Sequence, residues 1–172
     1  MAGYIEIARV GGAVYAKVVG LGNFNNAGPM RDYVEAALNE GIRGVVVDLA
    51  QCTGLDSTFM GTLWGFSTFP FCDTSKPEPV AVTVVNAVPS TLRAMTSLGL
   101  PKVLHVKDAP VDPPAVSLER LREGWQDRRA RTKLIHDAHK HLVKGDKENE
   151  ARFAPFLAAL VKEAREHLQD AS

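Results

Sequence analysis

The amino-acid sequence predicts an α/β fold, a mixed β-sheet packed with α-helices, followed by a C-terminal α-helical hairpin. Short runs of β-branched residues alternate with stretches of helical periodicity through the first 107 residues. The next segment, 108–116, contains three prolines and reads as a linker that cannot be helical. Beyond it, residues 117–172 are rich in charge and poor in strand patterning. We therefore expect one sheet domain at 1–107, a linker at 108–116 and a helical hairpin at 117–172.

The first part of the sheet domain begins with a β-hairpin. Residues 4–10 and 13–19 alternate apolar and polar side chains, and the two glycines between them favour a tight turn. Residues 20–29 include three Gly and three Asn, which predicts a loop. Pro29 suits the first turn of a helix that runs to Asn39.

The rest of the sheet domain continues the alternation of strands and helices. A strand at 45–49 is nearly all apolar, which indicates that helices cover both of its faces. In the third helix, Leu92, Met95 and Leu98 are expected to face inward. The further elements expected in chain order are a turn at 50–56, a helix from there to before Pro70, a loop at 71–79, a strand at 80–85, a helix at 88–98 and a strand at 103–106.

The C-terminal segment predicts two helices. Ser117 is a suitable N-cap for a helix that runs to Lys144, and Gly145-Asp146 ends it. The second helix begins by Pro155 at the latest. Its apolar positions have the spacing of one helical face, Phe153, Phe156, Leu157, Leu160, Val161, Ala164 and Leu168. This face and Trp125 need a cover, which is the sheet domain, a second copy in a homodimer, or a partner.

Composition restricts the classes of partner and the cellular compartment that are expected for the protein. Lys and Arg balance Asp and Glu at 20 each, so no global field directs the chain to nucleic acid or to an anionic membrane. The basic cluster at 128–133 is interspersed with other residues and is expected to be a solvated helix face. Only two cysteines, no signal peptide and no long apolar stretch predict a cytoplasmic chain without membrane insertion.

The segment that carries most functional information is Asp56-Ser57-Thr58, which opens a helix after a buried strand. All three residue types cap helices, so the simplest interpretation is a well-capped helix. The same geometry suits a phosphoryl group on Ser57, because the amides of Phe59 and Met60 would be free to donate to it. Such a group would place nearly two negative charges beside Asp56.

Three stretches of the sequence resemble STAS domains, the anti-sigma factor antagonist-like family. Asp48-Leu49 followed by Asp56-Ser57-Thr58 and Gly61 is similar to the family's buried strand, loop and Asp-Ser-Ser/Thr helix start. The stretch 92–104 is similar to its closing helix and strand. More weakly, Gly20-Leu21-Gly22-Asn23 stands where many members have Gly-Glu-Leu-Asp. The resemblance covers residues 4–107.

The resemblance implies a partner-switching protein of bacterial signalling and transcription regulation. It places the phosphorylated serine at Ser57, with Thr58 as second choice. An anti-sigma factor that is also a serine kinase would add the phosphate with its own ATP and magnesium, and a metal-dependent serine phosphatase would remove it. The partner-binding residues that it implies are Asn23, Asp56, Ser57, Thr58, Phe59 and Met60.

Two departures favour the alternative of a non-phosphorylated STAS adaptor or scaffold, in a stress-signalling or transport-associated complex. Phe59 replaces the family's glycine, which would put a ring where a kinase backbone approaches. Leu21 and Asn23 remove acidic groups from the neighbouring loop.

Other chemistries receive less support from the sequence. His136, His139 and His141 are close together, but we expect them on a solvated helix face and not in a phosphotransfer or zinc site. No serine or cysteine has an evident base with an orienting partner, so we expect no enzyme, no cofactor and no metal site.

Overall fold

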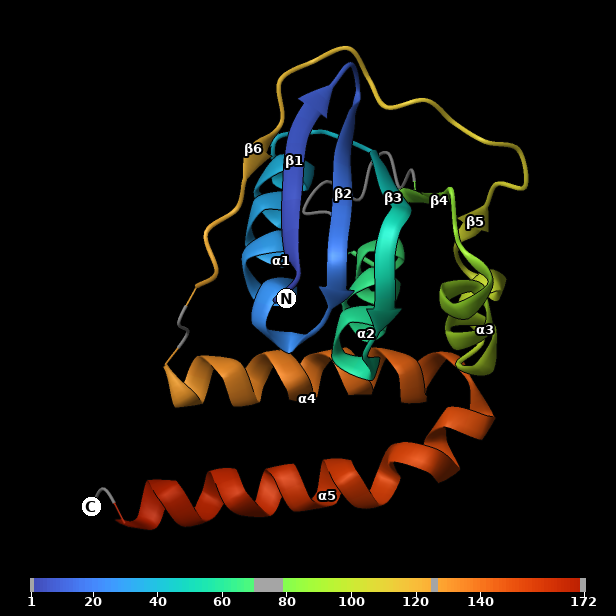
Figure 1. Ribbon diagram of the computed structural model, residues 1–172. Coiled ribbons are helices and arrows are strands. Elements are labelled where there is room, and N and C mark those ends of the chain that lie inside the picture. The colour runs from blue at the N-terminus through green and yellow to red at the C-terminus, as the bar shows by residue number, and fades with distance from the viewer. Residues whose placement is uncertain (1, 70–78, 125–126, 171–172) are drawn as a thin grey trace.

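The computed structural model describes residues 2–69, 79–124 and 127–170, and shows an α/β molecule with a helical hairpin across one end of a sheet (Figure 1). The strands are β1 (Tyr4–Val10), β2 (Ala13–Gly22), β3 (Gly44–Leu55), β4 (Ala81–Val85), β5 (His105–Val106) and β6 (Glu119–Arg120). The helices are α1 (Phe24–Asn39), α2 (Ser57–Ser67), α3 (Pro89–Ser97), the short 3-10 helix η1 (Leu100–Lys102), α4 (Arg128–Gly145) and α5 (Lys147–Asp170).

The sheet is mixed and has six strands in the order β5-β4-β3-β2-β1-β6. β1 and β2 form the expected antiparallel hairpin, with Tyr4 opposite Val19 and Val10 opposite Ala13. β2, β3, β4 and β5 run parallel to one another, which confirms the predicted crossover connections. The carboxyl ends of β2 and β3 therefore lie at the same edge of the sheet, and α4 crosses below them (Figure 1).

Two element boundaries near this edge differ from the prediction. β2 continues to Gly22 and α1 begins at Phe24, not at Pro29, because Asn23 forms a capping box with Asn26 that starts the helix five residues earlier. β3 continues to Leu55, through the expected turn at 50–56, because its last residues pair with Leu21 and Gly22 of the longer β2.

The segment after the linker also differs from the prediction. The expected helix from Ser117 is wrong, since Glu119 and Arg120 form β6, which pairs with β1. β1 would otherwise be an open edge strand, and a short added strand satisfies its backbone groups. α4 begins at Arg128, where the carboxylate of Asp127 accepts from the Ala130 amide at 2.7 Å. Trp125 lies outside the described residues.

Apolar side chains form one core between the sheet and the helices. It includes Val45, Val47 and Leu49 of β3, together with Leu63 of α2 and Leu142 of α4, so the hairpin contributes to the core. Met95 and Leu98 are buried as expected, but Leu92 is 41% exposed and does not face inward.

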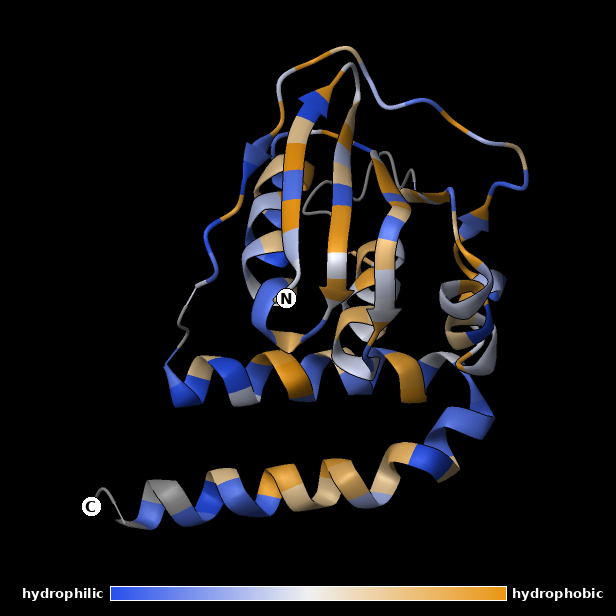
Figure 2. Ribbon diagram, in the orientation of Figure 1, coloured by the Kyte–Doolittle hydropathy of each residue, from blue (hydrophilic) through white to orange (hydrophobic). Residues whose placement is uncertain are grey.

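The hairpin is covered unevenly. Apolar residues are concentrated in the middle part of α5 (Figure 2), and not all of them are buried, since Phe156 is 42% exposed. No helix among the described residues is both long enough and apolar enough to cross a membrane.

Candidate functional site

The candidate site lies where two turns meet, from β2 to α1 and from β3 to α2. The Asp56 amide donates to the Gly22 carbonyl at 2.9 Å, which joins the two turns. The Asp56 carboxylate accepts from the Phe59 amide at 2.7 Å and from the Phe24 amide at 3.0 Å. One side chain thus caps α2 and fastens the start of α1 beside it. Burial raises the pKa of Asp56, and these amide hydrogen bonds oppose that rise.

The first turn of α2 is more enclosed than the sequence suggested. The side chains of Thr58, Phe59 and Met60 are buried, whereas Asp56 and Ser57 are partly exposed. The ring of Phe59 lies against Gly22, and so it belongs to the core and does not stand where a partner would approach. The Phe59 amide is bonded to Asp56, and the Met60 amide donates to the Asp56 carbonyl at 3.1 Å. The two amides expected to hold a phosphate are therefore already engaged.

Ser57 has a hydrogen-bond partner that is 82 residues away in the sequence. Its Oγ lies 2.8 Å from Nε2 of His139 in α4. The other ring nitrogen, Nδ1, lies 2.7 Å from the Ile135 carbonyl. A carbonyl oxygen only accepts, so Nδ1 carries the hydrogen and Nε2 of the neutral ring accepts. The Ser57 hydroxyl is thereby assigned as the donor.

His139 belongs to the protein interior. It is 3% exposed, and the rings of Phe153 and Phe156 contact it edge-on. Burial lowers the pKa of His139, which favours the neutral ring. The expected solvated histidine face is therefore wrong for this residue. A signal was present in the sequence, because Leu134, Ala138 and Leu142 form a buried stripe at helical spacing and His139 is next to it.

α4 approaches α2 closely along two glycines one turn apart. A Cβ atom added at Gly61 would lie 2.2 Å from the Ala138 carbonyl oxygen, and one added at Gly65 would lie 2.8 Å from the His141 ring. At the end of α4, a Cβ atom on Gly145 would lie 1.9 Å from the Trp64 ring. These approaches require residues without side chains, so the two helices fit each other at specific positions.

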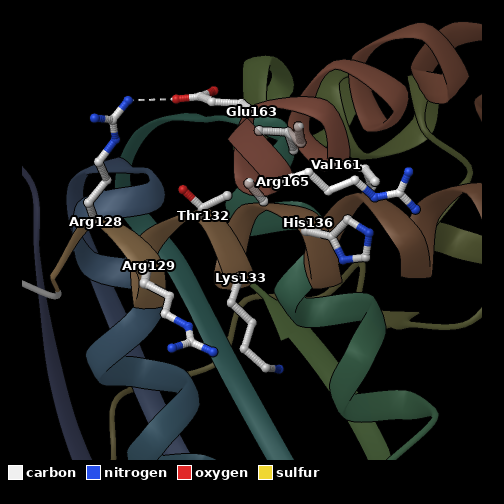
Figure 3. A pocket seen from close by; sticks show the side chains of 10 residues that line it. Arg128, Arg129, Thr132, Lys133, His136, Val161, Glu163 and Arg165 are labelled. Carbon is white, nitrogen blue, oxygen red and sulfur yellow. Dashed lines mark hydrogen bonds and ion pairs between the residues drawn. The ribbon is translucent and has the colours of Figure 1, made fainter. Parts of the chain in front are cut away.

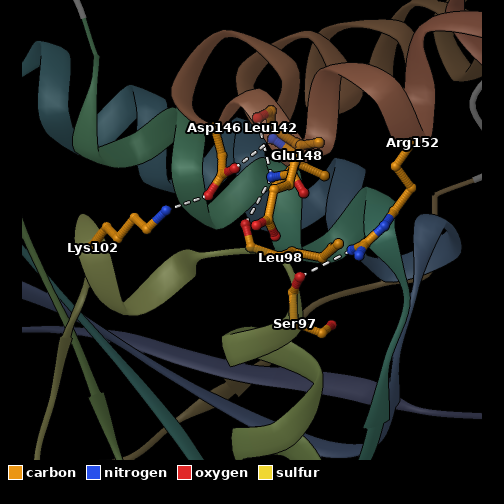
Figure 4. A network of polar contacts seen from close by, with 8 residues as sticks. Ser97, Leu98, Lys102, Leu142, Asp146, Glu148 and Arg152 are labelled. Atoms are coloured by element: carbon orange, nitrogen blue, oxygen red, sulfur yellow. Dashed lines mark hydrogen bonds and ion pairs between the residues drawn. The ribbon is translucent and has the colours of Figure 1, made fainter.

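A second set of contacts fastens the corner of the hairpin to α3 and η1 (Figure 4). The Asn149 side-chain amide donates to the Leu98 carbonyl at 2.8 Å and to the Leu142 carbonyl at 3.2 Å. Around it, the Lys102 ammonium lies 2.6 Å from the Asp146 carboxylate, and the Arg152 guanidinium donates to the Ser97 carbonyl at 2.9 Å. The hairpin is thus held to the sheet domain at its corner as well as along α2.

A groove of about 690 Å³ separates the outer parts of α4 and α5 (Figure 3). Arg128 and Glu163 pair across it at 2.8 Å. The charged ends of Arg129 and Lys133 point to the side of α4 away from α5 (Figure 3).

The sequence suggested that no serine has a base beside it, but the structure places His139 within hydrogen-bond reach of Ser57. A serine nucleophile also needs donors for a developing oxyanion, and the first-turn amides of Phe59 and Met60 are already bonded. Among the described residues, no group of three His, Cys, Asp or Glu side chains is placed to hold a metal ion. The arrangement is suited to a polar contact between two helices.

Comparisons with known proteins agree with the architecture. No family model matches the sequence, and no curated protein is significantly similar to it. The crystal structure of an anti-sigma factor antagonist from Mycobacterium paratuberculosis is similar with a TM-score of 0.52 and 18% identity, over 63% of this chain and 87% of that chain. The anti-sigma factor antagonist SpoIIAA in its unphosphorylated form is similar with a TM-score of 0.47 and 15% identity, over 61% of this chain and 88% of that chain. The strand and helix order of residues 4–106, together with the first of these likenesses, shows that this chain has a STAS-type fold.

Proposed function

We propose that this chain is a bacterial signalling protein, an anti-sigma factor antagonist-like module that binds partner proteins and is controlled by phosphorylation of Ser57. The observation that supports this best is the position of Ser57. It is the first residue of α2, directly after a long parallel strand, at the edge of the sheet where the carboxyl ends of β2 and β3 lie. Binding sites in α/β folds are commonly found at this edge.

The partner surface in this proposal is the α2 tip, defined as Asn23, Asp56, Ser57, Thr58 and Met60; Phe59 is left out because its ring is part of the core. Asn23, Asp56 and Ser57 are partly exposed, so they are the residues that a partner could reach first. A phosphoryl group on Ser57 would add nearly two negative charges beside the Asp56 carboxylate. A partner that met this charge and lost about 4 kcal/mol of binding would bind about a thousandfold more weakly.

The partners that fit this proposal are an anti-sigma factor with serine kinase activity and a serine phosphatase, in the cytoplasm. The proposal gives the chain itself no catalytic role. A homodimer through the C-terminal helices is compatible with it, because the exposed apolar side chains of α5, such as Phe156 and Val161, remain open to a second copy.

A second candidate function is a STAS adaptor that is never phosphorylated. One observation favours it: the Ser57 hydroxyl is bonded to a buried histidine, and Thr58, Phe59 and Met60 are also buried. A kinase would have to break the hydrogen bond between Ser57 and His139 before it could transfer a phosphate to Ser57.

The deciding experiment has two parts. The full chain is incubated with the candidate serine kinases of its own genome, and mass addition is located by peptide mapping. Binding of each candidate partner is then compared for wild type, Ser57→Ala and Ser57→Asp. The switch predicts phosphorylation of Ser57 and a loss of binding in Ser57→Asp only. Equal binding by both variants to every partner would support the adaptor.

A further inference from the structure

The α4 helix lies on the same tip of α2 at which the proposed partner binds. We infer that α4 is an intramolecular cover for this tip, and that a phosphate on Ser57 and a docked α4 exclude each other. The role of this cover in signalling rests on the proposed function. The mutual exclusion of the phosphate and α4 follows from contacts within the chain alone.

Specific contacts fit α4 to this position on α2. Gly61 allows the α4 backbone at Ala138 to enter the space that a methyl group would occupy, and Gly65 does the same for the His141 ring. His139 then reaches the Ser57 hydroxyl at 2.8 Å, and its orientation is set by the Ile135 carbonyl.

An unmodified Ser57 is compatible with α4 docked on the α2 tip, and a phosphorylated Ser57 is not. Transfer of a phosphoryl group from a nucleoside triphosphate to Oγ replaces the hydroxyl hydrogen, releases a proton and leaves the diphosphate. The hydrogen that His139 accepts is then gone, and three phosphate oxygens need space where the imidazole stands 2.8 Å away. A neutral Nε2 without a hydrogen can only accept, so it would face oxygen atoms that also only accept.

The hairpin can move at this point without leaving the domain. Its corner is held separately, by the Asn149 amide on the Leu98 carbonyl and by the Lys102–Asp146 ion pair. These contacts lie on α3 and η1 and do not involve Ser57. Phosphorylation is therefore expected to lift α4 from the α2 tip while the corner stays in place, and the phosphate on the uncovered tip would still repel the partner. A partner that binds the unmodified chain would have to displace α4 in the same way.

The experiment needs neither a kinase nor a partner. Phosphoserine is installed at position 57 of the full chain during synthesis, and amide hydrogen exchange is followed by mass spectrometry in α4 and in β3. We expect exchange in α4 to rise at least about tenfold, the change that about 1.4 kcal/mol produces, while β3 is unchanged. Ser57→Asp serves as a second variant if the phosphorylated chain does not fold.

Two glycine variants calibrate the result. Gly61→Ala forces α4 away sterically while it raises the helix propensity of α2, so it reports the exchange of a displaced α4. Gly12→Ala is the matched control, because its added methyl group meets no atom within 4 Å. The inference is overturned if phosphoserine leaves exchange in α4 at the wild-type rate, or if exchange slows because His139 becomes protonated and pairs with the phosphate. If the proposed function fails but the inference holds, partner binding would be the same with and without phosphate on Ser57, and phosphoserine would still release α4.

Discussion

Replacement of Asn149 by aspartate tests whether the corner of the hairpin is held by the two hydrogen bonds that the Asn149 side-chain amide donates. The residue is 1% exposed, and its amide donates to two carbonyls, of Leu98 and Leu142. Its Oδ1 has no hydrogen-bond partner among the described residues. Asn149→Asp keeps the size of the side chain but replaces the donor with a second acceptor. Two lost hydrogen bonds cost about 1–3 kcal/mol, and a buried carboxylate facing carbonyl oxygens raises the total to about 3–5 kcal/mol.

The assay is urea unfolding followed by circular dichroism, with Asn149→Ala as the matched variant that removes the same donors without adding a charge. The buried carboxyl group of Asn149→Asp should have a pKa above its unfolded value, so the folded state binds more protons than the unfolded state. Its stability relative to Asn149→Ala should therefore rise as pH falls from 7.5 to 5. A loss below about 0.5 kcal/mol in both variants, or a pH-independent difference between them, would show that the Asn149 amide does not hold the corner.

Three further predictions concern the cover and the cap. Burial lowers the pKa of folded His139 below the ordinary value of 6.5 that holds in the unfolded chain. The contribution of His139 to stability is therefore complete above pH 6.5 and declines as the pH falls below it. In His139→Gln, urea unfolding should show a smaller loss of stability between pH 7.5 and 5.5. Leu142→Ala, at a fully buried position, should lower the free energy of unfolding by about 2–5 kcal/mol, whereas Leu92→Ala should cost under about 1 kcal/mol; a similar loss in both would contradict the observed packing. Asp56→Ala removes the α2 cap and the bond to the α1 amide, so a loss of about 1–2 kcal/mol is expected, and a thermal melt unchanged from wild type would contradict it.

Local patterns in the sequence predicted the sheet domain well, because strand alternation and helical spacing report burial within a single element. β1 was predicted residue for residue, and the order of strands and helices through β5 is as expected. The errors at the ends of β2 and β3 arise from pairing between strands, and the earlier start of α1 arises from the capping box of Asn23 and Asn26. Whether Leu21 and Gly54 extend two strands or form two loops depends on their being opposite each other, and neither segment shows this alone.

The candidate site was only half predictable, for a related reason. Asp56 and Ser57 could be located because a helix cap has a local signature. His139 could not be assigned to Ser57, since their contact depends on how α4 crosses α2. The glycines at 61 and 65 have the spacing of a helix face, but only the structure shows which helix they admit. The short β6 was missed because its pairing with β1 is decided by an open sheet edge and not by its own residues.

The glycine pair on α2 has a consequence for evolutionary comparison. At position 65 the constraint comes from α4, a helix outside the sheet domain, whereas the glycine at position 61 also belongs to the sequence pattern that resembles STAS domains. In homologues without such a terminal extension, a larger residue at position 65 would be tolerated and even stabilising, since alanine is a better helix former than glycine. Covariation between small residues there and a histidine at the position of His139 would therefore mark the members in which the extension folds back, and would separate them from members whose tail extends elsewhere.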